Sequence, residues 1–121
     1  MNDIIKFMKQ IDTISLTELK DMSEKMYGAI VKSVVDIEKD ILVVDAEMHV
    51  DEEQYLLANG SRQNFLWGIN LHPGKFGTKD FIEFDSMINI RPSLNNMSRG
   101  IDDANVKKKI EEIVHKKVIN E

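Results

Sequence analysis

The sequence predicts an α+β fold, a two-layer sandwich in which helices cover one face of a mainly antiparallel four-stranded sheet. Runs of β-branched and aromatic residues come in two adjacent pairs, each pair separated by turn-forming residues, as in two β-hairpins. Amphipathic segments with capping residues precede, separate and follow these pairs. The expected order is therefore αββαββα, with room for one more strand at the N-terminus.

The N-terminal segment has the least specific pattern. The apolar residues of Asp3–Ile11 fit a short buried strand about as well as a helical turn, and we favour the strand. A chain of 121 residues has the length of one domain. We expect residues 1–121 to form a single domain, with residues 1–13 as a peripheral strand or a loose arm.

A helix and a hairpin are expected next. Ser15 and Glu18 form a capping box, and an apolar stripe then leads to Gly28, which predicts a helix of about three turns. The β-branched residues that follow are interrupted by a charged turn at residues 38–40. The two strands of this hairpin are expected at Ala29–Ile37 and Ile41–Met48.

Another helix and hairpin follow in the second half of the chain. A short helix is expected over Asp51–Asn59. Asp51 and Gln54 can cap its start, and Gly60 can take the left-handed conformation that ends it. Pro-Gly at residues 73–74 is turn chemistry between two further strands. These strands are expected at Phe65–Leu71 and Phe81–Ile90.

A polar loop rich in turn formers, residues 92–100, leads to the last helix. Asp102 or Asp103 is expected to cap this helix. An apolar stripe at helical spacing predicts its buried face. The stripe consists of Val106, Ile110, Ile113, Val114 and Val118.

Composition excludes several classes of function. The chain has no cysteine, which excludes disulfides, zinc–thiolate sites and thiol catalysis. There is no signal-peptide pattern and no apolar run near the ~20 residues of a membrane span, so we expect a cytoplasmic protein without a membrane partner. A net charge of -5 argues against broad, sequence-independent binding to nucleic acid. Nucleotide-binding, nucleophile-elbow and HExxH motifs are absent, and no cofactor is expected.

Residues 60–100 contain most of the unusual residue types. All three arginines, both prolines, the only tryptophan and five of the six glycines lie there, whereas eleven of the thirteen lysines lie outside. A guanidinium offers a planar fork of donors that lysine cannot copy. Two polar loops with arginines would suit a phosphate or carboxylate; alternatively, these arginines pair with acidic residues of the chain. The loop residues concerned are Ser61, Arg62, Asn96 and Arg99.

Polar side chains also alternate along the last expected strand, and side chains two apart on a strand share a face. This face is either solvated and laced with charge pairs, or a polar binding face, because its amides and guanidinium are more specific than interchangeable Lys and Glu. Trp67, on the neighbouring strand, is expected in the core. The polar face would carry Asn70, Glu83, Asp85, Asn89 and Arg91.

A third group, Asp45, Glu47 and His49, alternates near the end of the first hairpin. Carboxylates and an imidazole on one face could hold a hard or borderline cation. This spacing is common by chance, however, and a histidine beside a helix start is usually a cap or a surface residue. We therefore expect no metal site and keep this group only as an alternative.

Two runs, DAEMHVDEEQYLLANGSRQNFLWGINLHP and FIEFDSMINIRPSLNNMSRGIDD, resemble a family of small bacterial and archaeal proteins classified only as a domain of unknown function. The resemblance extends from Ile14 to Ile119 and rests on the strings GSxQ, LWGIN and IEFDSxINIRP. It implies a stand-alone domain and assigns no activity, substrate, cofactor or catalytic residue. Asp40 stands where relatives are expected to have glycine, which bears on how tight the first hairpin turn is.

Three functions are consistent with these observations. The first is a non-catalytic binding or interaction module for a small anionic ligand, nucleic acid or protein. The second is a metal-assisted hydrolase that uses His49 with the carboxylates Asp45, Glu47, Glu83 and Asp85. The third is a structural subunit that associates with itself, and a homo-oligomer is compatible with the first function too. The binding module would use Ser61, Arg62, Asn70, Glu83, Asp85, Asn89, Arg91, Asn96 and Arg99.

Overall fold

The computed structural model describes residues 9–25, 29–44 and 48–121. Its helices are α2 (Leu16–Glu24), α3 (His49–Ala58) and α4 (Ala104–Lys117), with single 3-10 turns η1 (Gln63–Phe65), η2 (Pro73–Lys75), η3 (Met87–Asn89) and η4 (Pro92–Leu94). Its strands are β1 (Lys9–Ile11), β2 (Ile14–Ser15), β3 (Val31–Asp36), β4 (Ile41–Val44), β5 (Leu66–Leu71), β6 (Ile82–Glu83) and β7 (Val118–Ile119).

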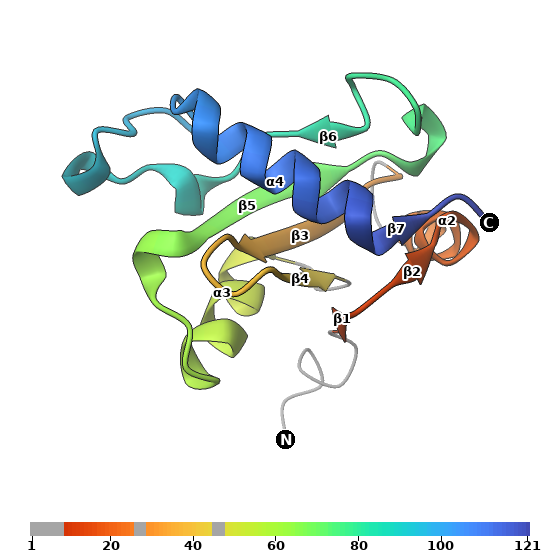
Figure 1. Ribbon diagram of the computed structural model, residues 1–121, viewed down its shortest axis with the longest axis horizontal. Coiled ribbons are helices and arrows are strands. Elements are labelled where there is room, and N and C mark those ends of the chain that lie inside the picture. Colours follow the sequence, from red (N-terminus) through yellow and green to blue (C-terminus); the bar gives the residue numbers. More distant parts are fainter. Residues whose placement is uncertain (1–8, 26–28, 45–47) are drawn as a thin grey trace.

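The centre of the fold is a five-stranded sheet in the order β1-β4-β3-β5-β6, and every neighbouring pair in it is antiparallel. β2 and β7 form a separate parallel pair. Figure 1 shows α4 crossing the large sheet on one side. The predicted α+β class with a mainly antiparallel sheet is confirmed, and the sheet has one strand more than the four expected. The predicted hairpins are joined through their first strands, because β3 pairs with β5.

Side chains of the large sheet alternate between two apolar faces. One face packs under α2 and α4, and the other packs on α3. The sheet is therefore the middle of three layers, and the predicted two-layer arrangement with helices on one face is wrong. The reason is that β3 is apolar on both sides: Val31 and Val35 contribute to one core cluster, whereas Val34 belongs to the other.

Two predicted helix starts are confirmed by their capping bonds. Ser15 Oγ accepts a hydrogen bond from Glu18 N at 3.1 Å at the start of α2. Asp103 Oδ1 accepts from the amides of Asn105 and Val106 at the start of α4. The buried residues of α4 are those of the predicted stripe, Ile110, Ile113 and Val114. The predicted end of the first helix, at Gly28, lies outside the described residues.

The predicted start of the second helix at Asp51 is wrong, because α3 begins at His49. Met48 occupies its N-cap without a side-chain cap, and Asp51 lies inside the first turn, where a carboxylate stabilises the positive end of the helix dipole. The end agrees with the prediction, since Gly60 adopts the left-handed φ of +96° after α3. The expected strand over Asp3–Ile11 lies mostly outside the described residues, and its last three residues form β1.

The first hairpin turns where it was expected to. Asp36 Oδ1 accepts hydrogen bonds from the backbone amides of Glu38 and Lys39, which fixes the turn. Asp40 then takes a left-handed φ of +56°, a conformation that aspartate tolerates better than most residues. A tight turn therefore forms without the glycine expected in relatives.

The second hairpin is much shorter than predicted, because β6 ends at Glu83. Ser86 Oγ accepts the amide of Ile88 and so caps the single turn η3, while Ser86 N donates to Arg99 O. These bonds take the chain off the sheet after β6. The alternating apolar residues up to Ile90 consequently do not mark a strand, and the prediction of a strand over Phe81–Ile90 is wrong beyond its first residues.

None of the described helices is both long enough and apolar enough to cross a bilayer. The longest, α4, has 14 residues, whereas a spanning helix needs about 20.

Gly68 is required for close packing between β5 and the segment after β6. A Cβ at this position would lie 2.6 Å from both the Cβ and the Oγ of Ser86 and 3.1 Å from Cγ1 of Ile88. We expect Gly68→Ala to lower the free energy of unfolding by about 1–3 kcal/mol, as overpacking of a tight site does. Urea denaturation measures the change.

Gly74→Ala is the matched control, because a Cβ at Gly74 meets no atom within 4 Å. Surface changes of this kind usually alter the free energy of unfolding by less than about 0.5 kcal/mol. Equal losses of stability in the two variants would contradict the packing role of Gly68.

Candidate functional site

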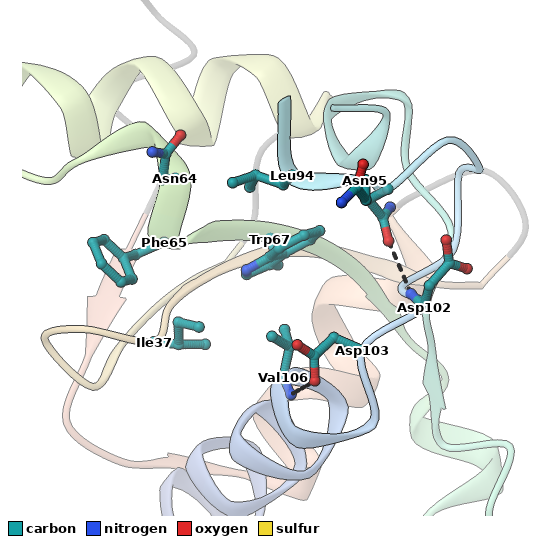
Figure 2. Close-up of a pocket in the computed structure, with 10 residues that line it drawn as sticks. Ile37, Asn64, Phe65, Trp67, Leu94, Asn95, Asp102, Asp103 and Val106 are labelled. Atoms are coloured by element: carbon teal, nitrogen blue, oxygen red, sulfur yellow. Dashed lines mark hydrogen bonds between the residues drawn. The ribbon is translucent and has the colours of Figure 1, made fainter. Parts of the chain in front are cut away.

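A cleft of about 520 Å³ opens at the end of the sheet where β3 stops and β5 begins, next to the N-terminus of α4 (Figure 2). This volume lies in the usual range for small-molecule sites, about 300–1,000 Å³. Its apolar walls are Ile37, Phe65, Trp67, Leu94 and Val106. Its polar residues are Asn64, Asn95, Asn96, Asp102 and Asp103. We call it the Trp67 cleft.

Local structure positions one wall of the Trp67 cleft. Leu94 ends η4, and Asn95 follows with a left-handed φ of +57° that reverses the chain. Arg91 and Asn96 then pair through two backbone hydrogen bonds of 2.7 and 3.1 Å. The short loop between them is thereby closed, and it holds Leu94 and Asn95 against the cleft.

Asn96 anchors the mouth of the cleft. Its side chain is buried, with Oδ1 accepting the amide of Asp102 at 2.9 Å and Nδ2 donating to the carbonyls of Asn89 and Gly100 at 2.8 Å each. An amide group satisfied on both sides is a rigid cross-link. It fixes the approach to α4, and hence the positions of Asp102 and Asp103.

Trp67 forms the floor and carries an unsatisfied donor. The residue is only 4% exposed, its Nε1 atom is shielded from solvent, and none of the described residues accepts a hydrogen bond from it. Figure 2 shows the nitrogen end of the indole directed to the side of the cleft where Ile37 and Phe65 lie. A buried donor without an acceptor costs about 1–3 kcal/mol, so this group is poised to gain from a ligand acceptor.

All three arginines of the chain pair with carboxylates. Arg62 pairs with Glu38, and its guanidinium lies 4.9 Å from the ring centroid of the cleft residue Phe65. Arg99 Nε lies 2.6 Å from Asp85 Oδ1. The third, Arg91, pairs with a glutamate of α3, as described next. The arginines thus pair with acidic residues of the chain, which was the alternative to ligand binding in the sequence analysis.

Arg91 is buried and joins three parts of the fold. It donates to Glu53 Oε2 at 2.8 Å and to the carbonyl of Leu66, and its guanidinium lies 5.2 Å from the ring centroid of Trp67. Burial lowers the pKa of Arg91 from its ordinary value, and the neighbouring Glu53 opposes that shift. The guanidinium therefore packs against the indole of Trp67, the floor of the cleft.

Asn89 replaces part of a missing edge strand. Its Oδ1 accepts the amide of Gly68 at 2.8 Å, and its Nδ2 donates to the carbonyl of the same residue at 2.9 Å. β6 pairs with β5 only at Asn70 and Leu71. The side chains of Asn89 and Arg91 bond the outer edge of β5 beyond that point, so both residues hold the sheet edge.

Four other expected site residues do meet at one place on the α3 side of the sheet. Asn70 Nδ2 donates to Glu83 Oε1 at 2.9 Å and to the carbonyl of Asp85 at 3.2 Å, and Asp85 binds Arg99. Glu83 also lies 3.2 Å from His72. Ser61 is not part of this group, because its backbone caps the end of α3 through Leu56 O.

His49 belongs to the group considered as a metal site, but Asp45 and Glu47 lie outside the described residues. His49 Nε2 lies 2.7 Å from the carbonyl of Ile69, which requires Nε2 to carry a proton. Burial lowers the pKa of His49, the hydrogen bond raises it in part, and Lys32 lowers it further. Within the described ranges no three His, Asp or Glu residues are grouped so as to hold a metal ion.

Sequence patterns missed most of the Trp67 cleft. Ile37, Phe65 and Leu94 were expected only as strand or loop residues, and Asp102 and Asp103 only as helix caps. Ile37, Phe65, Leu94 and the Asp102–Asp103 pair come from separate parts of the chain, and no spacing rule connects them. Asn96 is the one residue predicted for ligand binding that lines the cleft, and Trp67 was expected in the core.

Comparison with known proteins gives one match. The family model described as "Protein of unknown function (DUF5674)" matches residues 5–117. The comparisons with curated proteins and with solved structures each found no match. The resemblance to a family without an assigned function is confirmed.

The role of Asn89 in closing the sheet edge predicts a large loss of stability when its amide is removed. Asn89→Ala leaves the buried amide and carbonyl of Gly68 without side-chain partners, and we expect the free energy of unfolding to fall by about 2–4 kcal/mol. Asn105→Ala, at an exposed position of α4, is the control. Chemical denaturation of both variants measures the difference, and a loss for Asn89→Ala no larger than that of the control would contradict this role.

The lowered pKa of His49 predicts a pH dependence of stability. Below the ordinary value of 6.5 the unfolded chain takes up a proton that the folded protein resists, so the free energy of unfolding falls as pH decreases through this window. We expect the wild type to lose more stability between about pH 7.5 and pH 5 than His49→Gln does. Urea denaturation at several pH values measures both slopes, and parallel slopes would show that His49 does not cause the dependence.

Proposed function

We infer a function from the Trp67 cleft, because the chain belongs to the family of proteins of unknown function DUF5674, which has no assigned activity. We propose that the protein is a non-catalytic module that binds a small organic ligand. The observation that carries this proposal is the indole N–H of Trp67, which is buried at the cleft without an acceptor. Native proteins rarely leave such a donor unsatisfied. A bound acceptor would remove the cost.

The walls of the cleft support binding of an apolar or aromatic body. Phe65 is half-buried and offers ring surface, and Leu94 is 36% exposed at the rim. Covering such surface stabilises a complex by about 25 cal/mol per Å² of apolar area. A ligand of one or two rings therefore fits the chemistry of the walls.

Access to the indole N–H requires a small rearrangement. The atom lies behind Ile37 and Phe65, which are both only half-buried. Phe65 is contacted on its open side by the exposed guanidinium of Arg62. We expect rotation of this ring to be needed for an acceptor to reach Nε1, so Phe65 and Arg62 would act as the movable edge of the site.

We propose binding without catalysis because of the residue types that line the Trp67 cleft. The ten residues around the cleft include no serine, threonine, histidine or lysine. Asp103 is engaged in capping α4, which leaves Asp102 without a partner for nucleophilic or acid–base chemistry at hydrogen-bonding distance. Binding is the chemistry that remains.

Several finer expectations stay predictions. They are the cytoplasmic location, the bacterial or archaeal origin, and the use of GSxQ, LWGIN and IEFDSxINIRP as family signatures. The cluster of Asn70, Glu83, Asp85 and Arg99 stays a predicted second polar surface. Its charges already pair with one another, which makes it a weaker candidate than the cleft for holding a ligand.

The test uses the only tryptophan of the chain as the reporter. We expect a panel of one-ring and two-ring organic fragments, covering neutral, cationic and anionic members, to contain ligands that change Trp67 fluorescence and raise the melting temperature in a concentration-dependent way. Binding stabilises the folded state by mass action, by about 2.7 kcal/mol at a hundredfold excess over Kd. A panel without any such member would contradict the proposal.

A pair of leucines locates the binding. Leu94→Ala removes part of the cleft wall, and we expect it to weaken a hit by about tenfold, since loss of leucine contacts costs roughly 1–2 kcal/mol. Leu57→Ala on α3 is the matched control, because Leu57 and Leu94 are 38% and 36% exposed and Leu57 does not line the cleft. Equal weakening by both variants would place the ligand elsewhere.

A further inference from the structure

Resting on the proposed function, we propose that the ligand of the Trp67 cleft is an organic cation, with an amine, amidine or guanidinium group on an apolar or aromatic body. Asp102 and Asp103 line the cleft, and none of the lining residues is basic. Among the described residues, no lysine, arginine or histidine nitrogen lies within 4.0 Å of either carboxylate. The cleft therefore carries two negative charges that the protein does not neutralise locally.

Four cations of the segments around the cleft contact other groups. Arg62 pairs with Glu38, and Arg91 pairs with Glu53, so each of these guanidinium groups is already balanced. On α4, Lys107 Nζ lies 5.6 Å from the ring centroid of Phe84, and Lys109 Nζ lies 3.0 Å from Asp40. Within the described part of the chain, neither aspartate forms an ion pair with which a cationic ligand would compete.

The N-terminus of α4 would by itself favour an anion. Here the amides of Asn105 and Val106, which an anion would need, already donate to Asp103 Oδ1 at 2.8 and 3.3 Å. The helix dipole contributes only about half a positive charge, against the full charges of two carboxylates. The balance at the mouth of the cleft is therefore negative.

The floor of the cleft gives an independent reason to expect a ligand and supports its cationic character. Trp67 is only 4% exposed, and its Nε1 has no acceptor among the described residues. Aromatic rings also attract cations, and Phe65 and Trp67 line the cleft. A ligand with its positive group at the aspartates and an oxygen acceptor toward Nε1 would satisfy both ends of the site.

The charge requirement can be tested with three probes of nearly the same size and shape. Benzamidine is cationic, benzamide is neutral and benzoate is anionic at neutral pH. Each is titrated into the full chain, with Trp67 fluorescence and the backbone amide NMR signals of the residues lining the cleft as readouts. We expect benzamidine to bind at least about tenfold more tightly than benzoate, with benzamide between them, and its affinity to fall as salt screens the aspartates.

Charge-neutralising variants locate the effect. Asp103→Asn keeps a side chain that caps helices well and removes the charge, and Asp102→Asn removes the second charge. We expect each to weaken benzamidine by about threefold to tenfold and to weaken benzamide by a smaller factor. Asp80→Asn, at an exposed position outside the cleft, should alter neither.

The outcomes separate the two proposals. If benzamide or benzoate binds at the cleft as tightly as benzamidine, or if the aspartate variants leave benzamidine unaffected, the cationic preference is overturned while the binding site remains. If none of the three probes perturbs Trp67 or the cleft amides, and the wider fragment panel is also without effect, the proposed function itself fails. Binding of benzamidine that the aspartate variants weaken and salt reduces supports both.

Discussion

The outer edge of β5 is the constraint on which the rest of the structure depends. Buried backbone amides and carbonyls need partners, and β6 supplies them for only two residues of β5. Asn89 and Arg91 supply them for Gly68 and Leu66 through side chains. An asparagine carries the same donor and acceptor as a peptide unit, so it can substitute for a neighbouring strand.

This substitution has a geometric consequence for the cleft. Because the side chains of Asn89 and Arg91 must reach β5, the chain from η3 to η4 runs along the sheet edge instead of continuing the hairpin. The turn that follows then places Leu94 and Asn95 beside Trp67. The cleft exists because a strand is missing, and the polar residues that close the edge also shape its wall.

Charge is distributed differently between the two sides of this segment. The arginines were considered from the sequence for an anionic partner, but in the structure they pair with Glu38, Glu53 and Asp85. Such pairing is the ordinary outcome in a chain with more acidic than basic residues. Among the described residues, Asp102 and Asp103 have no ion-pair partner, and they lie where a helix cap and a cleft coincide.

Sequence alone determined the features that depend on near neighbours: the cap at Ser15, an aspartate cap at Asp102 or Asp103, the left-handed Gly60, the first hairpin turn and the buried stripe of α4. Bonds of this kind join residues only a few positions apart, so local spacing specifies them. Tertiary structure decided which polar residues close the sheet and which walls form the cleft. Many of those contacts join residues far apart in the chain, 38 positions for Arg91 with Glu53 and 25 positions for Arg91 with Leu66, and no local pattern encodes them.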